Sequence, residues 1–448
     1  MKINKCRGCF SDQIETVIDL GVQPWGNDFR SKDKKDESET YPLAVDFCHK
    51  CSLLSLNYTV PKEIMFSDHT YVSGSTETLT NHFKETAIEA LDILNETNEN
   101  NKKPKVLDIG SNDGTHLKQF KDLGCEVLGV ESAENVASIA QKNGINTKVA
   151  YFNEKFANDL DERFDLITAS GVFFHLEELH SAIKAIKELL SPNGIFVVQF
   201  IYLKDMVDNG AFDQIYHEHL VYYLFTTLDR LLDLYGLEIF DGTKREIHGG
   251  SGIAYIAKKG QRKIKKRLIT IFDDERDSGF LKVEKYHEWM KEIKDIKIKG
   301  RKFIKNAISE GKTIYGMGAP VKGNTLLNYF ELTTKEIKYL VEINPMRKNT
   351  VAPGSNIPVI LEDEVSEQPD IYYCLAWNFR KEMEIRYADL ENSGVDFYYP
   401  VLTNDYKNKA KYVPDEVNQN KTKIKKNDKI LITGSSGLVG TALTKFLI

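Results

Sequence analysis

The chain has 448 residues, of which 41% are hydrophobic and 28% are charged, and its formal net charge is −6. This length predicts two to four domains, and the composition is that of a soluble globular protein. The acidic balance disfavours a nucleic-acid binder, which would be expected to be basic. The sequence contains no apolar run of about 18 residues, so we expect no membrane span, and its first residues lack the apolar core of a signal peptide.

Two CxxC pairs occupy the N-terminal region, Cys6-x-x-Cys9 and Cys48-x-x-Cys51. Four thiolates at this spacing suit tetrahedral zinc with metal–sulfur distances of about 2.3 Å. Because four sulfurs fill the coordination shell, we predict a structural zinc that clamps a small domain, residues 1–66. His49 is expected to be solvated instead of binding the metal. Cysteines grouped as metal ligands indicate a reducing, cytoplasmic environment.

A polar stretch from Asp68 to Thr76 precedes a helix expected from about Thr78 to Leu94. The stretch could cover an active site, or it could only cap the helix through Ser75 or Thr76. We assign residues 67–103 to a helical lid and linker.

The next segment, Val106 to Gly114, predicts a buried strand followed by a glycine turn and a helix. A second apolar run ends in Glu131, where a carboxylate is placed to hold two ribose hydroxyls. The glycine spacing is not G-x-G-x-x-G; it resembles the first motif of class I S-adenosylmethionine (SAM)-dependent methyltransferases. The alternative is an ordinary tight turn between strand and helix.

Further strands are expected at Asp165–Ala169 and Gly194–Phe200, with helices between them. This alternation predicts a parallel sheet that binds its ligand at the carboxyl ends of the strands. We assign residues 104–245 to this α/β domain. Ser170 then lies in the loop that leaves the fourth strand, and His175 follows where a substrate-facing residue would lie.

The densest group of reactive side chains is Tyr216-His217-Glu218-His219. Histidine exchanges protons near neutral pH, and a neighbouring carboxylate can orient it, so at least one member is a candidate acid or base. On an extended segment His217 and His219 would face one side. The spacing is not the HExxH of zinc proteases.

The C-terminal half begins with residues 258–310, whose lysine- and glutamate-rich pattern predicts long solvated helices. A strand then leads into the glycine turn Gly316 to Thr325, where Lys322 could hold a phosphate together with backbone N–H groups. Strands at Lys338–Glu342 and Asp370–Leu375 imply a second doubly wound domain, residues 246–410, and a cleft between the two sheets is the usual place for a ligand.

The last part of the chain reads as a linker, residues 411–428, followed by another strand and glycine turn, residues 429–448. Gly434-x-x-Gly437-x-x-Gly440 resembles the dinucleotide turn of NAD-dependent sugar-nucleotide epimerases and dehydratases. We expect a truncated start of such a domain without oxidoreductase activity, and a fused or separate epimerase or dehydratase as a partner.

Together these blocks resemble the sugar-nucleotide C-methyltransferases that methylate C3 of dTDP-4-keto-deoxysugars, over about residues 1–410. The matching blocks are the two CxxC pairs, Tyr71 to Gly74, the Asp108 to Gly114 turn with Glu131, Phe174-His175, Tyr216 to His219, His248 to Ser251, and Gly316 to Thr325. Two positions depart from the family: Ser170-Gly171 stands where asparagine is common, and Gln199 where glutamate is common.

The resemblance implies a class I methyltransferase domain between a zinc module and a second Rossmann-like domain. It implies SAM as methyl donor, structural zinc, and a nucleotide sugar, most simply a dTDP sugar, as substrate. His219 is the expected base, with Tyr71, His175, Tyr216 and Glu218 around the same pocket. The expected cofactor residues are Asp108, Gly110, Ser111, Asn112, Asp113, Gly114, Glu131 and Ser170. The expected substrate residues are Lys322, Asn324, His248 and Ser251.

Two alternatives share some of these features. A methyltransferase of RNA, protein or another small molecule would need the Asp108 to Glu131 region but not the Tyr216 to His219 cluster. A non-enzymatic zinc interaction module would not need the cofactor turn.

Overall fold

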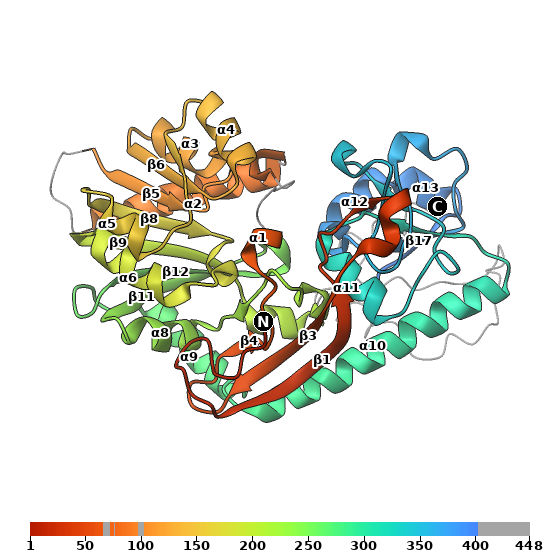
Figure 1. The fold of residues 1–448 in the computed structure, drawn as a ribbon, viewed down its shortest axis with the longest axis horizontal. Coiled ribbons are helices and arrows are strands. Elements are labelled where there is room, and N and C mark those ends of the chain that lie inside the picture. Colours follow the sequence, from red (N-terminus) through yellow and green to blue (C-terminus); the bar gives the residue numbers. More distant parts are fainter. Residues whose placement is uncertain (66–71, 76, 97–102, 402–448) are drawn as a thin grey trace, which may run out of the picture. The chain divides into compact units, whose positions relative to one another are not determined.

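The computed structural model describes residues 1–65, 72–75, 77–96 and 103–401 (Figure 1). These residues lie within one compact unit, residues 1–404. No helix in this described part is long and apolar enough to span a bilayer.

The zinc module is built on an antiparallel sheet with strand order β1-β3-β4-β10. Its strands are β1 (Ile14–Pro24), β3 (Thr40–Cys48), β4 (Leu54–Leu56) and β10 (Val221–Tyr222). The fourth strand comes from far along the chain, so this sheet is not confined to the first 66 residues. The charged stretch 31–40, expected to be a loop, contains the end of β2 (Arg30–Ser31) and the 3-10 helix Lys32–Glu37; α1 (Lys62–Met65) follows β4.

The central sheet has seven strands in the order β11-β12-β9-β8-β5-β6-β7. Its strands are β5 (Lys105–Ile109), β6 (Glu126–Glu131), β7 (Thr147–Val149), β8 (Phe164–Ser170), β9 (Leu190–Ile201), β11 (Leu237–Arg245) and β12 (Ser251–Lys258). All run parallel except β12, which is antiparallel to both neighbours. The sheet therefore continues past residue 245, the end expected for the central domain.

Helices cover both faces of this sheet, as parallel strands require (Figure 1). The helices around the sheet are α2 (Glu77–Asn95), α3 (Thr115–Asp122), α4 (Glu134–Lys142), α5 (Glu154–Asn158), α6 (Leu179–Leu189), α7 (Leu203–Asp208) and α8 (Phe225–Asp233). Successive strand residues enter opposite cores: Val106 packs in the cluster that contains α2 and α3, whereas Leu107 packs in the one that contains α6. This two-sided burial explains why the strands read as continuous apolar runs.

Two helices, α9 (Lys266–Asp277) and α10 (Val283–Ser309), follow the central sheet, as the charged pattern predicts. The 27 residues of α10 bury a stripe at helical spacing that includes Trp289, Ile293, Gly300 and Ile304. Its remaining faces are mostly exposed.

The C-terminal sheet has five parallel strands in the order β16-β14-β13-β17-β18. Its strands are β13 (Ile314–Met317), β14 (Leu340–Glu342), β16 (Val359–Leu361), β17 (Ile371–Cys374) and β18 (Asp396–Tyr398). Its helices are α11 (Val321–Tyr329), α12 (Arg380–Arg386) and α13 (Ala388–Asn392); β15 (Thr350–Val351) pairs instead with β2. The doubly wound second domain expected from the sequence is present.

Candidate active site

The four N-terminal cysteines converge as expected, with all four sulfurs within 4.8 Å of one another. The Sγ atoms of Cys6 and Cys51 are 3.6 Å apart, and those of Cys9 and Cys48 are 3.5 Å apart. A tetrahedral zinc with bonds of about 2.3 Å needs sulfurs about 3.8 Å apart, so the four side chains fit the metal closely. His49 takes no part, because its Nε2 pairs with Glu15 at 2.9 Å.

The zinc knuckle is bound to the central domain by hydrogen bonds. The Nε2–H of His180, on α6, donates to the carbonyl of Arg7 at 2.7 Å, and the ring of His180 stacks on Phe10. Arg230, on α8, donates to the carbonyl of Cys51 at 3.1 Å. Loss of zinc is thus expected to disturb the methyltransferase domain as well as the module.

The glycine turn at the end of β5 has the left-handed backbone that such a turn requires. Gly110, Asn112 and Gly114 have φ values of 65°, 49° and 81°. Glu131 at the end of β6 accepts hydrogen bonds from the backbone N–H groups of Asn112 at 3.0 Å and Ala133 at 2.8 Å. The turn and the terminal carboxylate therefore lie together, as an adenosine-binding site needs.

Two acidic members of the turn stabilise its shape, and their side chains are buried. Asp108 accepts from the hydroxyl of Thr168 at 2.6 Å. Asp113 accepts from the backbone N–H groups of Thr115 at 3.1 Å and Gly74 at 2.9 Å, so it ties the segment before α2 to the start of α3. The buried hydroxyl of Ser111 has no partner among the described residues, which leaves a donor for a ligand.

Gly110→Ala is expected to weaken SAM binding about tenfold, because the new Cβ would lie 2.7 Å from Cγ2 of Val172 at a positive φ. Gly124→Ala is the matched control, since Gly124 also has a positive φ (90°) but nothing lies within 4 Å of the added carbon. Calorimetry with SAM measures both affinities. Equal affinities for the two variants would contradict the prediction.

His219 is held in a defined tautomer. Its Nδ1 lies 2.7 Å from the carbonyl oxygen of Gln214, and since a carbonyl only accepts, Nδ1 carries the hydrogen. Burial lowers the pKa of His219 well below its usual value, so the ring is neutral and the lone pair is on Nε2. The ring centroid lies 3.8 Å from that of Tyr216 and 5.1 Å from that of His175.

The other two members of the cluster face elsewhere, because the segment is a turn and not extended: the N–H of His219 donates to the carbonyl of Tyr216 at 2.9 Å. The Nε2 of His217 lies 3.4 Å from the carbonyl of Tyr41, in the zinc module. The carboxylate of Glu218 accepts from the indole N–H of Trp25 at 2.7 Å. Burial raises the pKa of Glu218 to about 7.

A second group of residues lies just before this turn and was not foreseen from the sequence. Asp213 is fully buried and accepts from the indole N–H of Trp377 at 2.7 Å. The ammonium of Lys322 lies over the Trp377 ring, 3.7 Å from its centroid. Burial lowers the pKa of Lys322 to about 8, while the charge of Asp213 opposes that shift.

His248 is joined to the His219 turn by one residue. The side chain of Gln214 donates to the carbonyl of His248 at 2.8 Å, while its own carbonyl holds His219. The electrostatic coupling of His248 to both Lys322 and His219 brings the expected base and two expected substrate residues into one region.

Other expected site residues have structural partners. Asn324 donates to the carbonyl of Gly26 at 2.7 Å, and the hydroxyl of Ser251 donates to the carbonyl of Ile247 at 3.0 Å. Ser170 donates to Gln199 at 2.8 Å, which also accepts from His82 at 2.7 Å. Tyr71 and the dinucleotide-like turn at 429–448 lie outside the described residues.

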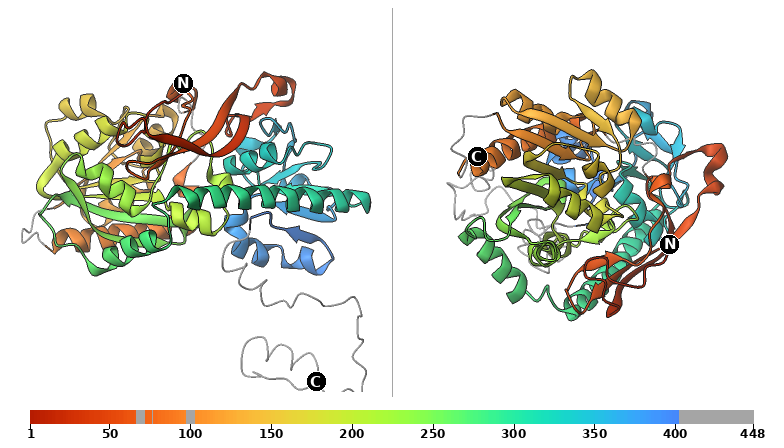
Figure 2. Two further views of the ribbon diagram at one scale, coloured as in Figure 1. Left: turned by 90° about the horizontal axis from the view of Figure 1, so that it is seen from below. Right: turned by 60° about the vertical axis from the view of Figure 1, so that its left-hand side comes forward.

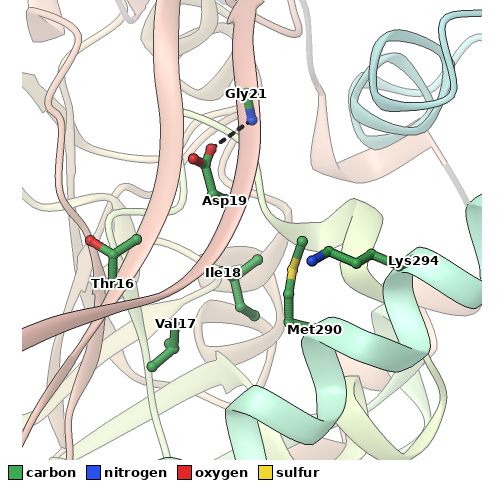
Figure 3. A pocket seen from close by; sticks show the side chains of 7 residues that line it. All are labelled: Thr16, Val17, Ile18, Asp19, Gly21, Met290 and Lys294. Carbon is green, nitrogen blue, oxygen red and sulfur yellow. Dashed lines mark hydrogen bonds between the residues drawn. The ribbon is translucent and has the colours of Figure 1, made fainter.

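A groove between β1 and α10, about 420 Å³ in volume, is separate from these groups (Figure 3). Its lining residues are Thr16, Val17, Ile18, Asp19, Gly21, Met290 and Lys294. None of the residues expected to act in catalysis lines it, and we assign it no role in the reaction.

Comparison with known proteins places a family description on each part of the chain. Residues 6–66 match a putative zinc binding domain, residues 81–241 a methyltransferase domain, and residues 246–401 a C-methyltransferase C-terminal domain. C-methyltransferase NovU of Streptomyces niveus is 27% identical over 405 residues, which cover 89% of this chain and 96% of that protein.

More distant similarities cover only the central part. A ubiquinone biosynthesis O-methyltransferase of Leptothrix cholodnii is 29% identical over 96 residues, 20% of this chain and 41% of that protein. The solved structure of the magnesium protoporphyrin IX methyltransferase ChlM of Synechocystis has a TM-score of 0.32 and 14% identity, covering 44% of this chain and 89% of that chain.

The seven-stranded sheet with its glycine turn and Glu131 defines a class I SAM-dependent methyltransferase domain. With a zinc-binding domain before it and a C-methyltransferase C-terminal domain after it, the chain belongs to the SAM-dependent C-methyltransferases that share this three-part organisation with NovU.

Proposed function

We propose that the protein methylates a carbon next to the keto group of a nucleotide-activated keto-deoxysugar, C3 of a 4-keto sugar. The observation that carries this proposal is the neutral imidazole of His219, whose Nδ1–H is fixed by Gln214 and whose Nε2 is available as a base. Removal of a proton beside a ketone needs such a base, whereas O-methylation of an acidic hydroxyl does not.

In this proposal Nε2 of His219 takes the C3 proton, and the electron pair of the C–H bond spreads onto the keto oxygen as an enolate. The phenol of Tyr216, whose ring packs against His219, steadies that oxygen. SAM, when bound, supplies an electrophilic methyl group on a sulfonium. The enolate carbon forms the new bond to that methyl group as the carbon–sulfur bond breaks, and the protein contributes mainly position.

The substrate class is supported by the second group of residues. Lys322 lies near the start of α11, which follows β13 and its glycine turn, and this placement suits the diphosphate of a nucleotide sugar. Glu131, with Gly110, Ser111, Asn112 and Gly114, is left for SAM at the other end of the reacting pair.

The test is a panel of dTDP-, UDP-, GDP- and CDP-linked keto sugars incubated with SAM in heavy water. We expect a product heavier by one methyl group in place of hydrogen, and deuterium uptake at C3 when SAM is withheld. Methylation without exchange, or methylation of RNA or protein in place of the sugars, would reject the proposal.

Lys322 should give sugar-nucleotide binding a pH dependence. An ammonium that binds phosphate loses its charge as pH rises through its pKa, so affinity is expected to fall through about pH 8. Asp213→Asn removes the carboxylate that favours the charged form, so the fall should begin at lower pH. Lys322→Arg stays charged throughout and should remove the fall. KM for the sugar nucleotide between mildly acidic and alkaline pH measures all three; identical profiles would contradict the prediction.

A further inference from the structure

The segment that follows β1 links the zinc module to both other parts of the described chain. We call residues 25–31 the strap. Its last two residues form β2, which pairs antiparallel with β15 of the C-terminal region. In Figures 1 and 2 the strap, in red, lies beside the cyan elements of that region.

At its start the strap holds the turn that carries His219. The indole N–H of Trp25 donates to Oε1 of Glu218 at 2.7 Å. The other end of Glu218 is fixed as well, because its backbone carbonyl accepts from Nδ1 of His175 at 2.6 Å. Glu218 is 7% exposed, so without the indole its carboxylate would be left in a largely dry place with Arg347 as its only favourable charge.

Further along, the strap is bound to the C-terminal region. The carbonyl of Gly26 accepts from Asn324 of α11 at 2.7 Å, and a Cβ at Gly26 would lie 3.1 Å from Cγ1 of Val321. The side chain of Asn27 accepts from Arg347 at 3.0 Å, and the same guanidinium lies 3.8 Å from the centroid of the Phe29 ring. One short segment is therefore bonded to the His219 turn and to the helix that bears Lys322.

We infer that Trp25 is a positioning residue for the reaction: it acts through Glu218 to set the places of His219 and His175. The inference rests on the proposed function for its kinetic readout, but the geometry itself is independent of the substrate. The hydrogen bond between Trp25 and Glu218 spans 193 residues of sequence, and it joins the zinc module to the turn that carries the base.

Trp25→Phe in the zinc-loaded, full-length protein is expected to slow deuterium uptake at C3 about tenfold, the usual worth of a hydrogen bond to a charged group, while KM for SAM stays unchanged. Trp289→Phe is the matched control, because that buried indole N–H has no hydrogen-bond partner among the described residues and lies on α10. A merely structural effect of losing an indole would appear in both variants and would lower the Tm without separating exchange from SAM binding.

Two further measurements complete the test. In combination with Glu218→Gln, the loss caused by Trp25→Phe should be smaller than in the parent, since the two groups act as a pair. Nitrogen NMR of the free protein should show the His175 and His219 rings shifted in Trp25→Phe and not in Trp289→Phe.

Exchange and ring signals that are equal in the two tryptophan variants would overturn the inference. If the parent protein exchanges with no sugar, the proposed function fails, and the ring signals alone still decide the role of Trp25.

Discussion

His219→Asn is expected to lose C3 proton exchange, and with it methyl transfer, by about 100-fold or more. A positioned general base contributes about that much, and the amide has no comparable basicity. Binding of SAM should be unchanged, because the glycine turn and Glu131 do not contact this ring. Exchange measured by mass spectrometry in heavy water, with SAM affinity from calorimetry, separates the two effects.

The matched control for that loss is His217→Asn. It removes an imidazole from the same turn, but one whose Nε2 faces the carbonyl of Tyr41. We expect exchange close to that of the parent, provided that the variant folds with an unchanged circular dichroism spectrum. If His217→Asn lost exchange and His219→Asn kept it, the base would have to be reassigned.

Cys48→Ser should release the zinc and lower the free energy of unfolding by more than about 5 kcal/mol, because binding of a structural metal is itself folding energy. The loss should reach the methyltransferase domain through His180 and Arg230, which bond to carbonyls of the zinc knuckle. We therefore expect a lower Tm and weaker SAM binding together. Metal analysis by mass spectrometry and a thermal melt measure the outcome.

Cys125→Ala is the control for the zinc prediction, since Cys125 is a buried thiol outside the metal cluster. It should retain one zinc per chain and lose only the stability expected from trimming a small buried side chain. A Cys48→Ser protein that still holds one zinc with an unchanged Tm would show that the four sulfurs are not the ligands.

Several elements were predictable because they depend on short-range patterns. The β5 strand, its glycine turn and Glu131 follow from apolar runs and spacing, and the structure brings them together. The cysteine pairs implied a cluster because thiols at that spacing have few other uses in a long reduced chain. The buried stripe of α10 follows from 3.6-residue periodicity.

Other features depend on contacts between distant residues. Nothing in the run Val221–Tyr222 indicates that it completes the sheet of the zinc module, because strand pairing is made by backbone groups that any residue carries. The end expected at residue 245 precedes β12, whose pairing with β9 brings it into the central sheet. The extended reading of the His217 to His219 segment missed the turn that separates the two rings.

The sequence by itself determined the class of chemistry: thiols for zinc, a glycine turn with a terminal carboxylate for SAM, and imidazoles for proton transfer. Only the tertiary structure decided which side chain does what. It assigned the hydrogen on His219 through the carbonyl of Gln214, turned Glu218 toward Trp25, and placed Asp213 beneath Trp377 and Lys322. The physical reason is that residue type fixes what a group can donate or accept, whereas burial and partners, which are set by packing across hundreds of residues, fix its protonation and direction.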